Sequence, residues 1–427
     1  MTKDRRVTLD IQEIGSRGDG IAEHEGRRYF VPLALPGESV VAAAQAERDE
    51  GVHARLIEVL APSRQRTPPP CAHFMLCGGC ALQHWRLDSY TAWKGQLIAR
   101  ALTQRGVSSP AFQPMLAGAP AERRRADFVL RRQGRRVLAG FHERGSPRIV
   151  DVASCVVASP ALGLLLAALR ATMHDVLPES GAADAIANET DTGLDLLIRP
   201  HRRHPVLLPA REALAALAEQ ADLARLSWGD RASAEPIVVR HTPLLLFGDV
   251  GVAPPPGVFL QATKRAELAM RAVVAAWVGD AERLADLFAG IGALSLGHPG
   301  KLSLFESDRQ AVAAAEAAAR TLAAGRVTVQ RRDLFRNPLT ERELAAFDGV
   351  LLDPPRAGAA TQCAELAGSK VARVVYASCD PGTFARDART LQDGGYRLEK
   401  LLPIDQFLWS AHVELIALFR RAPVRSS

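Results

Sequence analysis

One cysteine of this sequence stands where a buried strand is predicted to end. In "VARVVYASCDPGTF", an apolar run from Val371 to Ala377 is followed directly by Ser378 and Cys379. The carboxyl end of a parallel strand is the place where open α/β sheets bind their ligands. A thiol at that edge can act as a nucleophile if nearby positive charge or oriented backbone donors lower its pKa.

Such a thiol suits the methylation of a pyrimidine at C5. C5 is a poor nucleophile, but addition of a thiolate to C6 makes C5 an enolate-like carbon that can attack a methyl group. A base must then remove the C5 proton so that the thiol can leave. Glu414, in "HVELIALF" before an apolar C-terminal strand, is the candidate base. The plainer alternatives are a small buried hydrophobic residue for Cys379 and a solvated strand residue for Glu414.

A glycine turn and a series of acids indicate a ligand that carries adenosine. "AERLADLFAGIGALSL" is predicted to form a strand that ends in Asp286, a turn with Gly290 and Gly292, and the start of a helix. Glycines there let a ligand approach the backbone. Glu306 ends the next strand, where such folds hold ribose hydroxyls with an acid, and two further strand-end acids follow, Asp333 and Asp353.

The spacing of the glycine turn separates two kinds of ligand. Position 295 is Ser, so the full G-x-G-x-x-G pattern is absent. This favours S-adenosylmethionine over a dinucleotide. The alternative is an ordinary strand-turn-helix unit in which the acids serve as helix caps.

A basic segment lies between Arg123 and Arg148. It contains nine arginines against Asp127 and Glu143, and it alternates apolar and polar residues around Gln133 and Gly134, as a hairpin does. Such a surface suits a phosphate backbone. The alternative is a solvated face in an arginine-rich chain whose formal net charge is only +6.

The chain has 427 residues and divides into three parts by composition. Residues 1–61 alternate short β-type runs with glycine turns, as a small barrel would; residues 62–233 mix helical segments with the basic hairpin; residues 234–427 alternate strands and helices like a doubly wound α/β domain. No signal-peptide pattern and no apolar run of about 18 residues is present, so we expect a cytoplasmic protein without membrane contact.

Several motifs together resemble the RNA uracil-5 methyltransferases. They are "CAHFMLCGGCALQH", "VFLQAT", "DLFAGIGALSL", "LLDPPRAG", "YASCDP" and "HVELIALF". The segment "IQEIGSRGDGIAEHEGRRYFVPLALPGESVVA" is similar to the N-terminal TRAM domain, an OB-like barrel, of the 23S ribosomal RNA members. The tRNA-specific relatives lack both that domain and the cysteine-rich segment, so the resemblance favours 23S rRNA as the substrate.

The resemblance implies a fold and a role for each matching residue. The fold is α/β, with a C-terminal Rossmann-like class I methyltransferase domain, and Cys379 is the nucleophile and Glu414 the base. Phe259 lies near the target base, which must be flipped out of the RNA, and RNA is also expected to contact Arg124, Arg125, Arg131 and Arg132. S-adenosylmethionine is expected to contact Gln261, Phe288, Gly290, Gly292, Glu306, Asp333 and Asp353. Ala293 departs from the family pattern, since relatives often carry a polar residue there, and the segment from there to Glu306 is short.

Four cysteines form a candidate metal site in an α+β central part. Cys71, Cys77 and Cys80 have the spacing C-x5-C-x2-C, and Cys155 is a distant fourth. Four thiolates can hold a 4Fe-4S cluster, as the resemblance implies, or zinc. The C-x3-C-x2-C spacing of radical S-adenosylmethionine enzymes is absent, so we expect a cluster that supports structure or positions RNA.

Other functions stay open at this stage. Cytosine-5 methylation of RNA uses the same covalent chemistry, but those enzymes place a cysteine after the proline of a "DPP"-like motif, where this chain has Arg356. Methylation of adenine N6 would want an aromatic residue at that position. A tRNA uracil-5 methyltransferase and a non-catalytic RNA-binding assembly factor remain as further alternatives. We expect a monomer.

Overall fold

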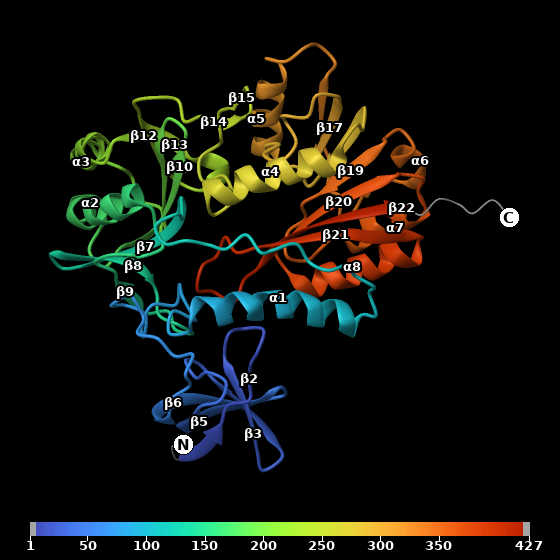
Figure 1. Cartoon of the computed structure of the whole chain (residues 1–427). Coiled ribbons are helices and arrows are strands. Elements are labelled where there is room, and N and C mark those ends of the chain that lie inside the picture. Colours follow the sequence, from blue (N-terminus) through green and yellow to red (C-terminus); the bar gives the residue numbers. More distant parts are fainter. Residues whose placement is uncertain (1–5, 422–427) are drawn as a thin grey trace.

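The computed structural model describes residues 6–421, and it contains three larger sheets and a two-stranded one (Figure 1). The first five residues of the predicted N-terminal part and the last six of the C-terminal part lie outside the described residues. No helix among residues 6–421 is long and apolar enough to cross a membrane.

The N-terminal sheet has six strands around a small core of its own. The strands are β1 (Arg6–Asp10), β2 (Glu13–Ile14), β3 (Gly20–His24), β4 (Arg27–Val31), β5 (Ser39–Arg48) and β6 (Gly51–Ala61), in the order β1-β5-β6-β4-β3-β2. Alternation puts Val7 and Leu9 of β1 into that core. Arg66, in the connection that follows, forms an ion pair of 2.6 Å with the buried Glu38.

The first helix, α1 (Leu87–Gln104), lies between the N-terminal strands and the C-terminal domain (Figure 1). The sequence predicts this helix within the central part. Its buried residues Ile98 and Leu102 nevertheless pack into the core of the C-terminal sheet, and Trp93 Nε1 donates to Ile14 O at 3.1 Å. Helix α1 therefore joins the N-terminal strands to the C-terminal domain.

The central sheet has seven strands and two helices that pack together on it. The strands are β7 (Arg125–Gln133), β8 (Arg136–His142), β9 (Ile149–Asp151), β10 (Ala182–Thr190), β11 (Gly193–Pro200), β12 (Leu223–Trp228) and β13 (Glu235–Val239), and the helices are α2 (Pro160–Val176) and α3 (Leu208–Gln220). The predicted hairpin is confirmed, with Gln133 paired to Arg136 and Gly134 at φ 58° in the two-residue turn. The sheet continues to Val239, whereas the sequence boundary falls after residue 233.

The C-terminal domain is an α/β unit, as predicted. Its sheet has the order β18-β17-β16-β19-β20-β22-β21, and β22 runs opposite to the other six strands. The strands are β16 (Arg283–Leu287), β17 (Lys301–Glu306), β18 (Val327–Arg331), β19 (Gly349–Leu352), β20 (Arg373–Ser378), β21 (Tyr396–Ile404) and β22 (Glu414–Arg421). A short hairpin, β14 (Leu245–Phe247) and β15 (Val250–Val252), precedes them.

Helices cover both faces of this sheet. They are α4 (Lys264–Val278), α5 (Arg309–Ala319), α6 (Glu341–Leu344), α7 (Ala360–Gly368) and α8 (Pro381–Asp393). Successive strand residues face opposite sides, so that Leu284 packs with α4 and α5, whereas Ala285 packs with α1, α7 and α8. Two hydrophobic cores therefore hold the strand ends in place.

The helix predicted after the glycine turn does not form. Residues 290–297 instead form consecutive turns, closed by bonds such as Leu296 N to Gly292 O at 3.0 Å, and β17 begins after three further residues. Pro299 explains this end, because the residue before a proline is disfavoured in the helical conformation. The segment from Ala293 to Glu306, which is short in the sequence, therefore lacks the whole helix that was predicted there.

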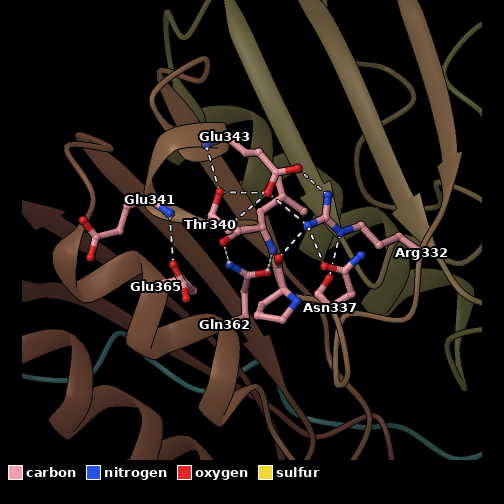
Figure 2. A network of polar contacts seen from close by, with 9 residues as sticks. Arg332, Asn337, Thr340, Glu341, Glu343, Gln362 and Glu365 are labelled. Carbon is pink, nitrogen blue, oxygen red and sulfur yellow. Dashed lines mark hydrogen bonds and ion pairs between the residues drawn. The ribbon is translucent and has the colours of Figure 1, made fainter.

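A polar network fixes the loop after β18 (Figure 2). Arg332 donates to Glu343 Oε1 at 2.6 Å and to Pro338 O at 2.6 Å, while Thr340 and Glu343 form a capping box at the start of α6. Gln362 of α7 accepts a hydrogen bond from the Leu339 N–H with its Oε1 and donates one from its Nε2 to Leu339 O. This network anchors the residue next to Asp333.

Candidate active site

The carboxyl ends of the parallel strands meet at one edge of the C-terminal sheet. From β16 the chain builds β17 and β18 to one side and then returns to build β19 and β20 on the other side. This reversal of strand order opens a crevice, which is where open α/β sheets bind ligands. The predicted residues Phe288, Glu306, Asp353 and Cys379 all follow or end these strands.

The glycine turn and Glu306 lie together, as the sequence predicts. Glu306 Oε2 accepts the Gly290 N–H at 2.9 Å, and its other oxygen accepts the N–H groups of Ser307 and Asp308. Gly290 has φ 55° and open space where a Cβ would point, whereas a Cβ on Gly292 would come within 2.6 Å of Leu296. Gly290 thus leaves room for a ligand, and Gly292 allows close packing.

Two aromatic rings lie next to this turn. Phe288, at φ 64°, and Phe335 have ring centroids 5.3 Å apart, and Phe335 is 45% exposed. Asp333 Oδ1 accepts the Phe335 N–H at 3.1 Å, so the predicted acid orients this second ring. Our sequence interpretation missed Phe335, although an aromatic residue two positions after a strand-end acid was a usable signal. Exposed aromatic faces suit the stacking of a planar ring.

A buried acid completes this half of the crevice. Asp286 accepts a hydrogen bond from Ser295 Oγ at 2.5 Å, and Oδ1 has no partner among the described residues. Burial, with the charges of Asp353 and Glu306, raises the pKa of Asp286 to about 8 in spite of Ser295. A ligand with a donor group would satisfy the open oxygen, so the residues present fit a nucleoside ligand that carries hydroxyl and ammonium groups.

The thiol of Cys379 lies among acids. Burial raises its pKa to about 12, and the charges of Glu414, Asp353 and Asp380 add to this, while Arg356 opposes it. The sequence-based condition for activation, a pKa lowered by positive charge, is therefore not met by the chain alone. A positively charged ligand in the crevice would lower the pKa of the thiol.

Glu414 lies beside Cys379 on the neighbouring strand. Ser378 pairs with Leu415 across β20 and β22, which places both residues at the same sheet edge. The alternative of a solvated Glu414 is wrong, because the residue is only 5% exposed. Burial and the charge of Asp353 raise the pKa of Glu414 to about 8, while a hydrogen bond from Gln406 and the charge of Lys94 lower it. Burial also raises the pKa of Asp353, to about 7.

Gln406 connects Glu414 to another predicted residue. Gln406 Nε2 donates to Gln261 Oε1 at 2.8 Å, and Gln406 Oε1 accepts the Ala262 N–H at 2.7 Å. The buried Gln261 therefore shares its partner with Glu414. Our sequence interpretation missed Gln406, and since it lies in the connection before β22, only the fold reveals its position.

Most of the predicted RNA-binding residues reach the surface, whereas one of them, Arg124, is buried. Phe259 is 57% exposed, and the Arg125 guanidinium lies 4.9 Å from the centre of its ring, so this pair forms a cation–π contact at the surface. Arg131 is exposed, and Arg132 is half-buried with a bond of 2.8 Å to Leu177 O. Arg124 departs from the prediction: it is buried, because its charge is required to neutralise the fully buried Glu267.

Five ion pairs neutralise much of the basic segment, two of them within the segment and three with acids outside it. The sequence shows only Asp127 and Glu143 nearby, but the fold brings acids from elsewhere. The pairs are Arg125 with Asp127, Arg132 with Glu179, Arg136 with Asp151, Arg144 with Asp19, and Arg148 with Glu143. The segment is therefore less positive than its sequence suggests.

The four cysteines of the predicted metal site lie in neighbouring segments. Gly78 N–H donates to His142 O at 2.9 Å, and Ala153 N–H donates to His73 Nε2 at 3.1 Å, which ties the two segments together. Burial raises the pKa of Cys80 to about 11, and the charges of the three other cysteines act in the same direction. Within the described part of the chain, however, no three histidine, cysteine or acidic side chains stand close enough to hold a metal ion.

Comparisons with known proteins agree with this geometry. The family model described as tRNA (uracil-5-)-methyltransferase matches residues 318–422. An uncharacterised RNA methyltransferase of Brucella suis is 42% identical, over 99% of each chain. The 23S rRNA (uracil(1939)-C(5))-methyltransferase RlmD of Chromohalobacter salexigens is 32% identical, over 97% of this chain and 89% of its own length.

A solved structure shares the fold. The tRNA (uracil-54, C5)-methyltransferase of Pyrococcus abyssi, in complex with S-adenosyl-L-homocysteine, superimposes with a TM-score of 0.76. The match covers 96% of this chain and 99% of the other at 20% sequence identity. The likeness therefore extends over the whole arrangement of sheets, including most of the N-terminal strands. The expectation that tRNA-specific relatives lack the N-terminal domain is thus wrong for the Pyrococcus abyssi enzyme, and the presence of that domain does not by itself favour 23S rRNA.

Proposed function

We propose that this chain, which belongs to the RNA uracil-5 methyltransferase family and is an S-adenosylmethionine-dependent enzyme, methylates a uridine of 23S rRNA through a covalent bond between Cys379 and C6 of the base. The observation that carries the proposal is the placement of Cys379 and Glu414 on adjacent strands at one sheet edge. The 32% identity to a 23S rRNA methyltransferase supports the choice of RNA.

The cofactor is proposed to lie along the crevice from the glycine turn to Cys379. Glu306 and Asp333 would hold the ribose and adenine side, Phe288 and Phe335 would flank the planar base, and Asp286 would accept a donor of the ligand. When bound, S-adenosylmethionine supplies the methyl group, on a sulfonium sulfur, that C5 takes up. Gln261, Gly290, Gly292 and Asp353 complete the proposed contacts.

The reaction uses the two protein groups in sequence. Cys379 Sγ adds to C6 and gives up its proton to Asp353, whose pKa of about 7 suits it as the acceptor and whose charge acts on the thiol, so that Glu414 stays free to act as the base. After C5 has been methylated, the Glu414 carboxylate removes the C5 proton. The bond between Sγ and C6 then breaks, which restores the ring and the thiolate.

The target base is proposed to enter from the side of Phe259. This exposed ring, with Arg125 against its face, gives a flipped pyrimidine a surface on which to stack next to the crevice. Arg131 and Arg132 of the hairpin are proposed to contact the RNA backbone.

The remaining parts are assigned by resemblance. We propose that residues 1–61 form a TRAM-like RNA-binding barrel, that residues 62–233 carry a 4Fe-4S cluster on Cys71, Cys77, Cys80 and Cys155, and that residues 234–427 form the methyltransferase domain. The charges of Cys71 and Cys155 act on both Cys77 and Cys80, which supports the choice of these four thiols as one set. Because the thiols are too far apart for a preformed site, the cluster would draw these segments together.

Mapping of 5-methyluridine by mass spectrometry tests this function. Ribosomal RNA and tRNA from strains with the gene, without it, and with Cys379→Ala are digested and compared. We expect one or more 23S rRNA fragments to lose a methyl group in both defective strains. Loss from tRNA alone would refute the substrate assignment, and unchanged methylation in the Cys379→Ala strain would refute the covalent mechanism.

A further inference from the structure

A cavity outside the crevice is lined mainly by aromatic and apolar groups. Its volume is about 520 Å³, within the range of roughly 300–1,000 Å³ that small-ligand sites have. Its walls come from the connection between β6 and α1, from the first residues of α1 and from the connection between β21 and β22. They include Pro68, Pro70, Trp85, Arg86, Leu87 and Trp409. Neither the proposed cofactor nor the proposed target base occupies this cavity.

The backbone fixes Trp409 at one wall of the cavity. Trp409 has φ 58°, which is uncommon for a bulky residue. Its carbonyl oxygen accepts the Ala81 N–H at 2.7 Å and the Leu82 N–H at 3.0 Å, and the residue is only half-buried. Because the backbone already holds this tryptophan in place, little further order is lost when a planar group stacks on its ring.

The other walls are rigid and carry little net charge. Trp85 is buried, and its Nε1 donates to Gln65 Oε1 at 2.8 Å, so its polar atom already has a partner. Arg86 forms an ion pair of 2.9 Å with Asp88 at the rim, and Leu87 is 48% exposed. The cavity therefore suits a planar, uncharged group better than an anion.

Two arginines without acid partners lie along the same connection as Trp409. The Arg123 guanidinium lies 5.9 Å from the centre of the Phe407 ring, and Arg356 donates to His412 Nδ1 at 3.2 Å. The rings of Phe407 and His412 are 5.9 Å apart, edge to face. Neither arginine forms an ion pair with an acid of residues 6–421. Rings that alternate with free cations are typical of surfaces that bind single-stranded RNA.

We propose that the cavity beside Trp409 holds an unpaired nucleobase of the RNA substrate, a second base besides the one that is methylated. This inference rests on the proposed function and deepens it. Trp409 is five residues before Glu414, so their Cα atoms lie within about 18 Å of each other. A few nucleotides of an extended strand span this distance. The uncharged base fits the apolar cavity, and Arg123 and Arg356 fit the phosphates between the two bases.

Removal of single bases from the RNA tests the occupant of the cavity. The 23S rRNA fragment that carries the mapped 5-methyluridine is prepared with an abasic site at each position near the target in turn. Its affinity for the full-length protein is measured by filter binding. With the wild type, one position should weaken binding about tenfold when it is abasic, as the loss of one stacked base does. Trp409→Ala should bind the intact RNA about tenfold more weakly, and the abasic site at that position should then cost nothing more.

Three further variants separate stacking from structure. Trp409→Phe keeps an aromatic face and should retain most of the affinity. Leu87→Trp fills the cavity from α1 without changing the connection before Glu414, so it should act like Trp409→Ala, and it decides the question if Trp409→Ala does not fold. Leu164→Trp, at a position of α2 that is 73% exposed and does not line the cavity, is the matched control and should bind like the wild type.

Two results would overturn the inference. One is that no abasic position near the target weakens binding by the wild type. The other is that Trp409→Ala and Leu87→Trp leave the cost of every abasic site as it is in the wild type, because a merely structural role of these residues would not depend on one base.

A trapping experiment separates this inference from the proposed function. A target with 5-fluorouridine has no C5 proton to remove, so a covalent adduct should accumulate with the wild type. If the wild type forms no adduct, the proposed function and this inference both fail. If the adduct forms but no abasic position depends on Trp409 or Leu87, only the inference about the cavity fails.

Discussion

The edge of the C-terminal sheet and the β7–β8 hairpin carry their charges in opposite ways. At the edge, Asp286 and Glu414 are buried and each keeps one oxygen without a hydrogen-bond partner among the described residues. On the hairpin, arginines such as Arg132 and Arg136 form ion pairs with acids of the chain. These arginines of the hairpin are thus paired within the chain, whereas the open oxygens of Asp286 and Glu414 are available to a partner from outside. Glu267 also has an oxygen without a hydrogen bond, but Arg124 and Lys264 lie beside it as cations. Burial without a cation in an ion pair therefore distinguishes the proposed site better than the density of charge does.

The largest effect is expected at the edge. Cys379→Ala should lower the rate of methyl transfer by at least about 10³-fold, because no other group can add to C6. The measurement is the transfer of a labelled methyl group to RNA. Cys363→Ala is the matched control, since Cys363 is a fully buried cysteine of α7 away from the edge and its loss should affect stability alone. Equal loss in both variants would contradict the comparison.

Arg124 tests how much an ion pair within the chain contributes to the free energy of unfolding. Arg124→Ala leaves the buried Glu267 with only the longer contact of 3.5 Å to Lys264, so the free energy of unfolding should fall by about 2–4 kcal/mol. Arg131→Ala, at an exposed position of the same segment, should leave the free energy of unfolding nearly unchanged. Denaturant titration of both proteins measures the difference. Similar stability losses would show that the division into paired and open charges is wrong.

Asp286 tests the opposite case, because its charge is buried without a full set of partners. Its pKa in the folded protein is about 8, above that of an unfolded chain, so the folded state binds the proton more tightly. Its ionisation therefore costs stability progressively as pH rises from about 4 to about 8. Asp286→Asn should be more stable than the wild type at pH 8 by about 2–5 kcal/mol, and much less so at pH 5. Thermal melts at both pH values check this, and an equal shift at both would contradict it.

The smallest effect is expected at the exposed arginine of the hairpin. Arg131→Ala should weaken RNA binding a few-fold for all sequences and reduce the slope of log K against log salt by about 1, as the loss of one phosphate contact does. Filter binding at several salt concentrations measures both quantities. Unchanged affinity and slope would exclude this residue from the RNA interface.

The distance in sequence between the residues that make a feature explains which predictions from sequence succeeded. The strand ends at Glu306 and Ser378, the hairpin turn at Gly134 and helix α1 follow from local periodicity and turn residues, so the sequence was sufficient to predict them. The antiparallel pairing of β22 with β20 then brings Glu414 beside Cys379. Local patterns thus fix the strand end that carries Cys379, whereas the position of Glu414 also depends on that pairing.

Other features depend on contacts between segments distant in the sequence. The burial of Arg124 depends on Glu267, and the position of Gln406 depends on the antiparallel insertion of β22. The pairing of Lys94 with Asp405 joins α1 to a connection more than 300 residues away. Neither composition nor periodicity contains this information, and the loss of the helix after Gly292 was visible only as a short segment.

Trapping of the covalent adduct tests the central claim most directly. Wild-type protein, S-adenosylmethionine and a 23S rRNA fragment with 5-fluorouridine at the target are mixed and analysed by mass spectrometry under denaturing conditions. The account predicts a methylated protein–RNA adduct attached at Cys379 and none with Cys379→Ala. An adduct attached elsewhere, or methylation of normal RNA by the alanine variant at the wild-type rate, would contradict it.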